Sequence, residues 1–449
     1  MKEESDCFAG LATASTTPRL AVSDSEQDHS NLSQRYQRHL PQELIDCIID
    51  ELHDDRISLA LCALVSRSWV NESRHHLFMT VNLQAYDSLE SPLPSFSELL
   101  LNNLNLQQFV RTLMINNKKA FIHPVKGKVE LSLLGSILGR LPNLRTLSLH
   151  WVQIAVASDL RSSLLSMEDA LDLPEVVLWG VDFQVQSHNE DSFDPFLRLF
   201  THIGFFDLDW CRVIDTHGEK ADVIRENLIS RLRVHRLQVM ACARPIEQAL
   251  YLSIVPSRIR FAAVGFLWFH GKGVLSSFLC NPEVKLTALE LNWNYVNPLH
   301  LSTDALQSWS SLTLRCCRWL SLIIIRLSIY EGRPSQNVFV WSSVVALLAT
   351  LPITFTGRLE LYVTLLHQGD YVGLSTSIHE LDWDAFTIAV RGKAQAMKCY
   401  LLHHPAISRE SFIQFKNIIT DRLCGHGERA PVVCIEQKAI DDWRLMAGV

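Results

Sequence analysis

The chain has 449 residues, of which 48% are hydrophobic and 20% are charged, and its net charge is −7. This composition is typical of a globular protein with a large apolar core, and the length predicts two or three domains. The acidic balance and the lack of a long basic tract argue against binding to nucleic acid or to an anionic membrane.

The N-terminal residues differ in composition from the rest. Residues 1–35 are rich in Ser, Thr, Asp, Glu and Gln and poor in large apolar side chains, which predicts a disordered tail. No apolar run follows a basic start, so no secretory signal is expected and the chain is predicted to be cytoplasmic, nuclear or both. Its 11 cysteines are then reduced, and without a CxxC pair they give no zinc framework.

The segment from Leu40 to Leu83 predicts short helices with an excess of apolar surface. Pro41 suits the first helical position, and Glu43 complements the positive end of the helix dipole. Apolar side chains then recur at helical spacing on both sides of an acidic break. They are Leu44, Ile45, Ile48, Ile49, Leu52, Leu59, Leu61, Cys62, Leu64, Val65 and Trp69. About forty residues cannot bury this much apolar surface alone, so a partner is expected to cover it.

The order Leu40-Pro41-x-Glu43-Leu44, Ile48, Cys62 and Val65-Ser66-Arg67-x-Trp69 resembles the F-box. F-boxes are three-helix modules that dock on a Skp-family adaptor, so the resemblance implies a fungal-type F-box over residues 36–83. The adaptor-binding residues that it implies are Leu40, Pro41, Leu44, Ile48, Leu59, Val65 and Trp69. Leu52 and Leu61 are interpreted as internal packing. The alternative is an ordinary helical start to the next domain.

Two segments further along the chain have a charge pattern that stands out. Lys118, Lys119, Lys126 and Lys128 form the densest basic group, and their spread predicts a solvated loop. The uncharged run 338–355 is near the length that spans a bilayer, but serines and Pro352 interrupt it, so a buried helix is predicted.

Short alternating segments over residues 84–406 suggest an internal repeat. Several end in tryptophan, at Trp151, Trp179, Trp210, Trp268, Trp293 and Trp383. Others lack it, at Leu237-x-Val239, Ile325-x-Leu327-x-Ile329 and Leu359-x-Leu361-x-Val363. A strand plus a helix about every thirty residues is typical of a leucine-rich-repeat-like solenoid, with the tryptophans stacked at one inward position. An irregular α/β domain is the alternative.

The outward strand positions of such a solenoid are candidate target-binding residues. They are Thr146, Ser148, His150, Asp207, Asp209, Glu290, Asn292, Asn294, Arg326, Ser328, Glu360, Asp382 and Asp384. From Asp207 onward this set is mainly acidic, which predicts a groove for a basic segment of a target protein. The residues proposed to bind the target are Asp207, Asp209, Glu290, Asn292, Asn294, Asp382 and Asp384. Ordinary solvent-facing polarity is the alternative.

The C-terminal residues 407–449 are predicted to cap the repeat region, with a strand near Val432–Ile435 and a closing helix through Trp443. The expected fold is thus an all-α three-helix F-box followed by an α/β leucine-rich-repeat-like solenoid.

Catalytic motifs are missing from the sequence. It has no P-loop, no G-x-S-x-G, no H-E-x-x-H and no dinucleotide glycine fingerprint. Gly271-Lys272-Gly273 is interpreted as a turn. His75-His76 and His403-His404 are interpreted as ordinary histidines without Cys, Asp or Glu at ligand spacing. No catalytic, cofactor or metal site is therefore expected, and the chain is not expected to be an enzyme.

The resemblance implies a substrate-recognition subunit of a Skp-cullin-F-box ubiquitin ligase. Its F-box would bind the Skp-family adaptor, and through it cullin, while the repeat region holds a protein target. Two alternatives are an F-box binding protein that acts outside a ligase and an enzyme concealed in the α/β region.

Overall fold

The computed structural model describes residues 40–85, 91–117, 126–156, 170–187, 190–214, 231–265, 272–294, 312–330, 333–366, 371–391, 393–403, 409–424 and 432–439. The chain divides into two compact units, residues 1–73 and 74–449. The predicted tail 1–35, the Phe266-x-Trp268 segment and the closing helix through Trp443 lie outside the described residues.

The described part of the first unit is helical. Its helices are α2 (Gln42–Asp50), α3 (Arg56–Val65) and the start of α4 (Arg67–Met79). The Asp55 carboxylate caps α3, because its Oδ1 accepts hydrogen bonds from the backbone N–H groups of Ile57 and Ser58, each at 3.1 Å. The hydrogen bond from the Ser58 hydroxyl, 2.6 Å long, is the main cause that lowers the pKa of Asp55.

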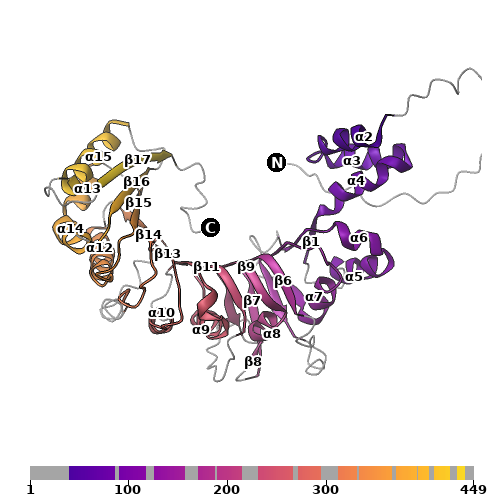
Figure 1. The fold of residues 1–449 in the computed structure, drawn as a ribbon, viewed down its shortest axis with the longest axis horizontal. Helices are drawn as coiled ribbons and strands as arrows, with labels where there is room; N and C mark the ends of the chain where they lie inside the picture. The colour runs from indigo at the N-terminus through magenta and orange to yellow at the C-terminus, as the bar shows by residue number, and fades with distance from the viewer. Residues whose placement is uncertain are drawn as a thin grey trace, which may run out of the picture. The chain divides into compact units, whose positions relative to one another are not determined.

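The second unit is built on a 12-stranded sheet in which every paired strand runs parallel to its neighbour (Figure 1). Its strands are β1 (Thr80–Gln84), β2 (Thr112–Asn116), β4 (Thr146–His150), β6 (Leu171–Trp179), β9 (Phe200–Asp209), β11 (Arg233–Met240), β12 (Phe261–Gly265), β13 (Ala288–Asn292), β14 (Leu322–Tyr330), β15 (Arg358–Leu366), β16 (Ala396–His403) and β17 (Val432–Ala439). They lie in the sheet in this order, which is also their order along the chain.

A second sheet and the helices complete this unit. The second sheet has the order β10 (Arg212–Ile214), β7 (Asp182–Ser187), β5 (Val152–Ala155) and β3 (Gly127–Glu130), with β8 (Glu190–Asp191) paired to β7. The helices are α5 (Pro92–Asn102), α6 (Leu104–Phe109), α7 (Leu131–Leu138), α8 (Phe193–Leu197), α9 (Arg244–Ser253), η4 (Pro256–Arg258), α10 (Lys272–Leu279), α12 (Pro334–Ala349), α13 (Tyr371–His379), α14 (Trp383–Val390) and α15 (Arg409–Cys424). Figure 1 shows α7, α8 and α9 on one side of β6, β9 and β11.

The expected fold class was wrong. In place of an all-α F-box followed by a leucine-rich-repeat-like solenoid, the structure is an α/β fold with a large parallel sheet. The range expected to be all-α includes Thr80–Leu83, which forms most of strand β1. A regular alternation of one strand and one helix fails between β4 and β11, because the chain there also forms β5, β7, β8 and β10.

Period-two alternation explains why the strands form where they do. On β4, Leu147 and Leu149 are buried in the main hydrophobic cluster, and the residues between and beside them point to the opposite face. Leu289 and Leu291 on β13, and Leu359 and Leu361 on β15, are buried in the same cluster. These strands were predicted correctly because each carries the Leu-x-Leu alternation of a sheet with one buried face.

Several strand ends turn through the left-handed backbone region. The residues there are Trp151 (φ 56), Gly180 (φ 65), Trp210 (φ 57) and Ala241 (φ 56). Each donates its backbone N–H to a carbonyl on the next strand, as Trp151 does to Trp179 at 2.8 Å and Gly180 does to Asp209 at 2.8 Å. After the first three of these turns the chain enters β5, β7 and β10, so the turns connect the two sheets.

The tryptophans do not share one inward position, contrary to the prediction. Trp151 and Trp210 occupy the left-handed turns, and Trp179 is the last residue of β6. Trp293 is buried just beyond β13, whereas Trp383 begins α14. The Leu381-x-Trp383 segment, expected to be a strand, instead leads into a helix.

An ion cluster holds the second sheet together. The Asp182 carboxylate lies 2.9 Å from the Lys126 ammonium and 2.9 Å from the Arg212 Nε. The Lys126 and Asp182 side chains are only 10% and 6% exposed. The prediction of a solvated lysine loop was therefore wrong for Lys126, while Lys118 and Lys119 lie outside the described residues.

The uncharged run near residue 338 forms α12, as predicted. Its Val340, Trp341, Val344, Leu347 and Leu348 are buried in the hydrophobic cluster, and the helix ends three residues before Pro352. Within the described ranges, no helix is both long enough and apolar enough to cross a membrane. In the C-terminal segment, β17 extends the sheet by pairing with β16, and the predicted strand is confirmed.

Candidate functional site

Helices α2 and α3 each carry two apolar stripes, one buried and one exposed. The buried stripes contain Ile45 and Ile49 on α2 and Leu59 and Cys62 on α3. The exposed stripes contain Leu40, Leu44 and Ile48 at and before α2, and Ile57, Leu61, Leu64 and Val65 on α3. A single apolar face is enough to pack a small helix against its own unit. The second apolar face of each helix is exposed to solvent in the described structure.

The exposed stripes include most of the residues that the F-box resemblance implies for adaptor contact. Leu40, Leu44, Ile48 and Val65 are exposed apolar residues, with Leu44 at 51%. Pro41 is also exposed, and Trp69 is half-buried.

Two of the sequence interpretations were wrong in opposite senses. Leu59 is fully buried, so it packs inside instead of offering a contact surface. Leu61, interpreted as internal packing, is 58% exposed, and Leu64, not selected as a contact, reaches 83%. The spacing of Ile57, Leu61, Leu64 and Val65 indicates one face of a helix, but spacing alone does not show which of the two apolar stripes packs in the core.

Four of the expected target-binding residues lie on one face of the large sheet, hereafter its polar face: Asp207, Asp209, Glu290 and Asn292. Strand register aligns Val177, Asp207 and Gln238 across β6, β9 and β11, and Trp179, Asp209 and Met240 in the next row. Because alternate residues share a face, Asp207 and Asp209 project to the same side of β9.

Asp207 and Asp209, hereafter the acidic pair, are desolvated carboxyl groups. Burial is the main cause that raises the pKa of Asp207 to about 6, and the Glu175 charge raises it further. Burial likewise raises the pKa of Asp209 to about 7, with a second contribution from the Asp207 charge. The Gln238 side chain bonds to Asp207, but the Oδ1 atoms of both carboxyls are buried without a hydrogen-bond partner in the described structure. A cation that reached this pair would stabilise its charged form.

The other predicted carboxylates on this face are already neutralised. Arg326 Nε lies 2.5 Å from Glu290 Oε1, and Arg358 lies 2.8 Å from Glu360. The Arg326 guanidinium also lies 4.3 Å from the Tyr362 ring centre, and Tyr362 stacks on Tyr400 at 4.4 Å. The sequence suggested a mainly acidic face, but Glu290 pairs diagonally with Arg326 on the next strand, and Glu360 pairs with Arg358 on its own strand.

The remaining predicted target-binding residues divide into two groups. Asn292 ends β13 and is buried, and its side chain accepts from the Asn294 backbone N–H at 2.9 Å. Asp382 and Asp384 are not on a strand, so their predicted position was wrong. Asp382 caps α14 by accepting from the Ala385 backbone N–H at 2.8 Å, and Asp384 lies in the first turn of that helix.

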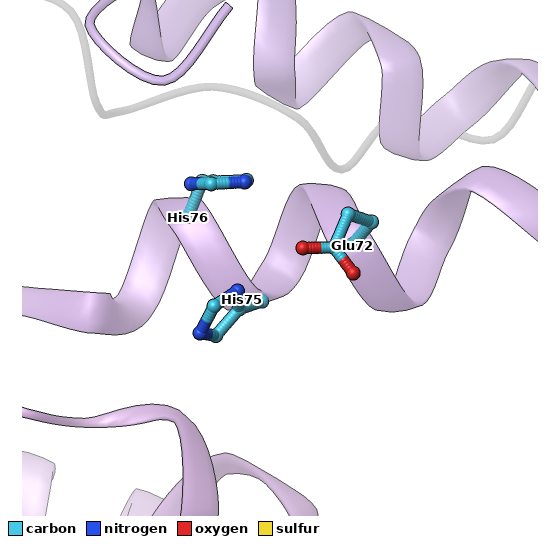
Figure 2. Close-up of side chains that lie close together, drawn as sticks. All are labelled: Glu72, His75 and His76. Carbon is cyan, nitrogen blue, oxygen red and sulfur yellow. The ribbon is translucent and has the colours of Figure 1, made fainter. Parts of the chain in front are cut away.

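Helix α4 carries a group of possible metal ligands. Glu72, His75 and His76 each offer one ligand atom, and these atoms all lie within 4.8 Å of one another. Figure 2 shows the three side chains along one stretch of α4, with the two imidazole rings pointing to different sides. The interpretation of His75-His76 as lacking a nearby carboxylate was wrong, because Glu72 precedes His75 by three residues, about one helical turn.

These donors suit zinc in type, since imidazole nitrogen and carboxylate oxygen bind it at roughly 2.0–2.2 Å. A tetrahedral ion on this group would need a fourth ligand from outside it. The His75 ring also lies 6.1 Å from the Phe109 ring, an apolar contact that needs no metal. The arrangement therefore supplies a partial ligand set, and it carries no catalytic proposal.

No protein-family model matches this chain, and no curated protein matches it. The likeness to the F-box therefore rests on the residues between Leu40 and Trp69 alone.

Proposed function

We propose that this chain is a recruitment protein that docks on a Skp-family adaptor through the exposed stripes of α2 and α3. In this role it is the substrate-recognition subunit of a Skp-cullin-F-box ubiquitin ligase, acting in the cytoplasm or the nucleus. The observation that carries the proposal is the second, exposed apolar face on each of two short helices. The F-box-like spacing of the residues on these faces supports the choice of partner.

Burial of the exposed stripes against an adaptor would contribute enough free energy to offset the cost of association. Full burial of a large apolar side chain contributes about 1.5 to 3 kcal/mol. Leu44, Ile48, Leu61, Leu64 and Val65 together offer a gross stabilisation of several kcal/mol, part of which offsets the lost freedom of association.

We further propose that the polar face of the large sheet holds the protein target. The acidic pair supports a target with a basic segment, because a lysine or arginine side chain would meet two desolvated carboxyls that have no ion-pair partner among the described residues. The mechanism is positioning: the target is held near the partner enzymes, and its effective concentration there rises.

Co-expression with a Skp-family adaptor tests the docking step. We expect wild type to recover the adaptor and Leu44→Ala/Leu61→Ala to lose most of it, because both side chains are exposed and their removal leaves the internal packing intact. Equal recovery by the variant and wild type would overturn the proposal.

Two controls separate binding from folding. Glu51→Ala changes an exposed polar residue at the end of α2 and should leave recovery unchanged. Leu59→Ala removes a fully buried side chain and should cost about 2 to 5 kcal/mol of stability, so its loss of adaptor would be accompanied by loss of helix. The purified complex is then tested for cullin. Its presence would indicate a ligase subunit, and its absence would indicate a protein that binds the adaptor outside a ligase.

A further inference from the structure

Two cysteines from separate segments meet beside the C-terminal end of α10. Helix α10 is anchored in the core by Leu275, Phe278 and Leu279, and Cys280 follows it directly. The backbone N–H of Cys280 donates to the Ser276 carbonyl at 2.9 Å, so the cysteine continues the last turn of the helix.

The second segment is the turn that precedes β14. Within it, the backbone N–H of Cys317 donates to the Leu314 carbonyl at 3.0 Å, and that of Arg318 donates to Cys316 at 2.9 Å. The Cys317 thiol points inward and lies 3.8 Å from the Leu279 carbonyl, a weak sulfur hydrogen bond. This contact fixes the turn against the end of α10.

The turn places the Cys316 thiol beside the Cys280 thiol, whereas the Cys317 thiol is buried. The side chains of Cys280 and Cys316 are hydrogen-bonded to each other. Cys316 is exposed and Cys280 is half-buried, so solvent reaches this pair. Cys317 is buried, and burial raises the pKa of its thiol to about 12, which keeps it unreactive.

We propose that Cys280 and Cys316 form a redox modification site, which a hydroperoxide converts to an intramolecular disulfide. In the first step the Cys316 thiolate attacks the terminal oxygen of the hydroperoxide and the O–O bond breaks, which gives a sulfenic acid. The leaving oxygen takes a proton from solvent and departs as an alcohol, or as water when the oxidant is hydrogen peroxide. In the second step the Cys280 sulfur attacks the Cys316 sulfur, the S–O bond breaks, and the hydroxyl group leaves as water with the thiol proton of Cys280. Two thiols lose two electrons in total, and the hydroperoxide gains them.

The order of the steps follows from the surroundings of the two sulfurs. Cys316 is the exposed partner, so the oxidant reaches it first. Burial and the neighbouring Cys316 thiol raise the pKa of Cys280, so Cys280 remains a thiol until the sulfenic acid stands beside it. A dithiol reductant or glutathione reverses the modification by thiol exchange.

The proposed bond would link the end of α10 to the turn before β14, which lie on either side of β13 in the chain. A cross-link of this kind restrains the unfolded chain and raises thermal stability when the native geometry accepts it.

Peptide mapping of the full chain tests this site. We expect hydrogen peroxide treatment, followed by alkylation and non-reducing digestion, to give a Cys280–Cys316 cross-linked peptide that disappears on reduction. In Cys280→Ser, dimedone should instead label Cys316 as the trapped sulfenic acid. Melting under reducing conditions checks that the variant is folded.

Cys47 provides the matched control, because it is an exposed thiol on α2. Cys47→Ser should form the cross-link as wild type does. The proposal is overturned if Cys280 and Cys316 are recovered fully alkylated at a peroxide concentration that oxidises Cys47. A Cys316–Cys317 cross-link, or one between two chains, would overturn it equally.

Discussion

Asp207 and Asp209 occupy alternate positions on β9, where the sheet leaves their carboxyl groups short of hydrogen bonds. In the unfolded chain each carboxyl ionises near its usual pKa of about 4. In the folded chain the pKa values are about 6 and about 7, so the native state binds protons more tightly. A group of this kind destabilises the fold at neutral pH.

The sign of the resulting pH dependence is fixed. Between about pH 4 and pH 7 the folded state holds more protons than the unfolded state, so the free energy of unfolding falls as pH rises through this window. Below pH 4 the acidic pair no longer destabilises the fold, and above pH 7 its destabilising effect is complete.

We predict that Asp209→Asn raises the melting temperature at pH 8 and has little effect at pH 4. One pKa unit corresponds to about 1.4 kcal/mol, so the gain at pH 8 should be roughly 2 to 4 kcal/mol. Thermal melts at the two pH values measure it. Some pH dependence should remain in the variant, because burial also raises the pKa of Glu247 to about 8. A lower melting temperature than wild type at pH 8 would contradict this account.

At the scale of elements, the connection between the two sheets depends on left-handed turns. Gly180 takes φ 65, and a Cβ built on it would lie 2.6 Å from the Trp151 indole carbon Cε3. Trp151 itself takes φ 56 in the preceding turn, so successive turns pack on each other. The position therefore needs glycine both for its backbone and for its space.

We predict that Gly180→Ala destabilises the second unit by about 1 to 3 kcal/mol, because it adds backbone strain and a contact with the indole. Chemical denaturation followed by tryptophan fluorescence measures the change. The matched control is Gly139→Ala at the end of α7, where φ is −63 and a new Cβ would lie 3.4 Å from the Gly135 carbonyl oxygen. That control should be neutral or slightly stabilising. Equal effects at both positions would refute the role of the turn.

The helices and strands also show which sequence patterns are sufficient to predict secondary structure. Leu-x-Leu alternation located β4, β13 and β15 correctly, because a one-sided core imposes a period of two. Leu381-x-Trp383 has only two alternating apolar residues, and Asp382 favours a helix start there. The Glu290–Arg326 ion pair is diagonal, because Arg326 lies opposite Asn292 across β13 and β14, and the spacing within one strand does not contain that register.

At the scale of the whole molecule, the two proposed surfaces belong to separate compact units. The exposed stripes lie within residues 40–65, whereas the acidic pair lies within residues 74–449. Sites that share no interacting residues contribute independently to free energy.

We therefore predict that the two surfaces can be altered separately. Leu44→Ala/Ile48→Ala should lose adaptor capture and keep the wild-type dependence of melting on pH. Asp209→Asn should keep adaptor capture and lose much of that pH dependence. Capture assays and melts on both variants test the pair of statements. A reduced adaptor affinity in Asp209→Asn would show that the surfaces are coupled.

The order of the 12 strands has a consequence for how the chain is made. Each strand of the large sheet pairs with the strands that come just before and just after it within that sheet, and the end strands β1 and β17 pair with one strand each. During synthesis from the N-terminus, β1 and β2 can pair before β17 exists, and each later strand finds a completed edge to join. Nascent chains of increasing length are therefore partial sheets to which each new strand is added at one edge. The strands made first can pair before the C-terminal strands have been synthesised.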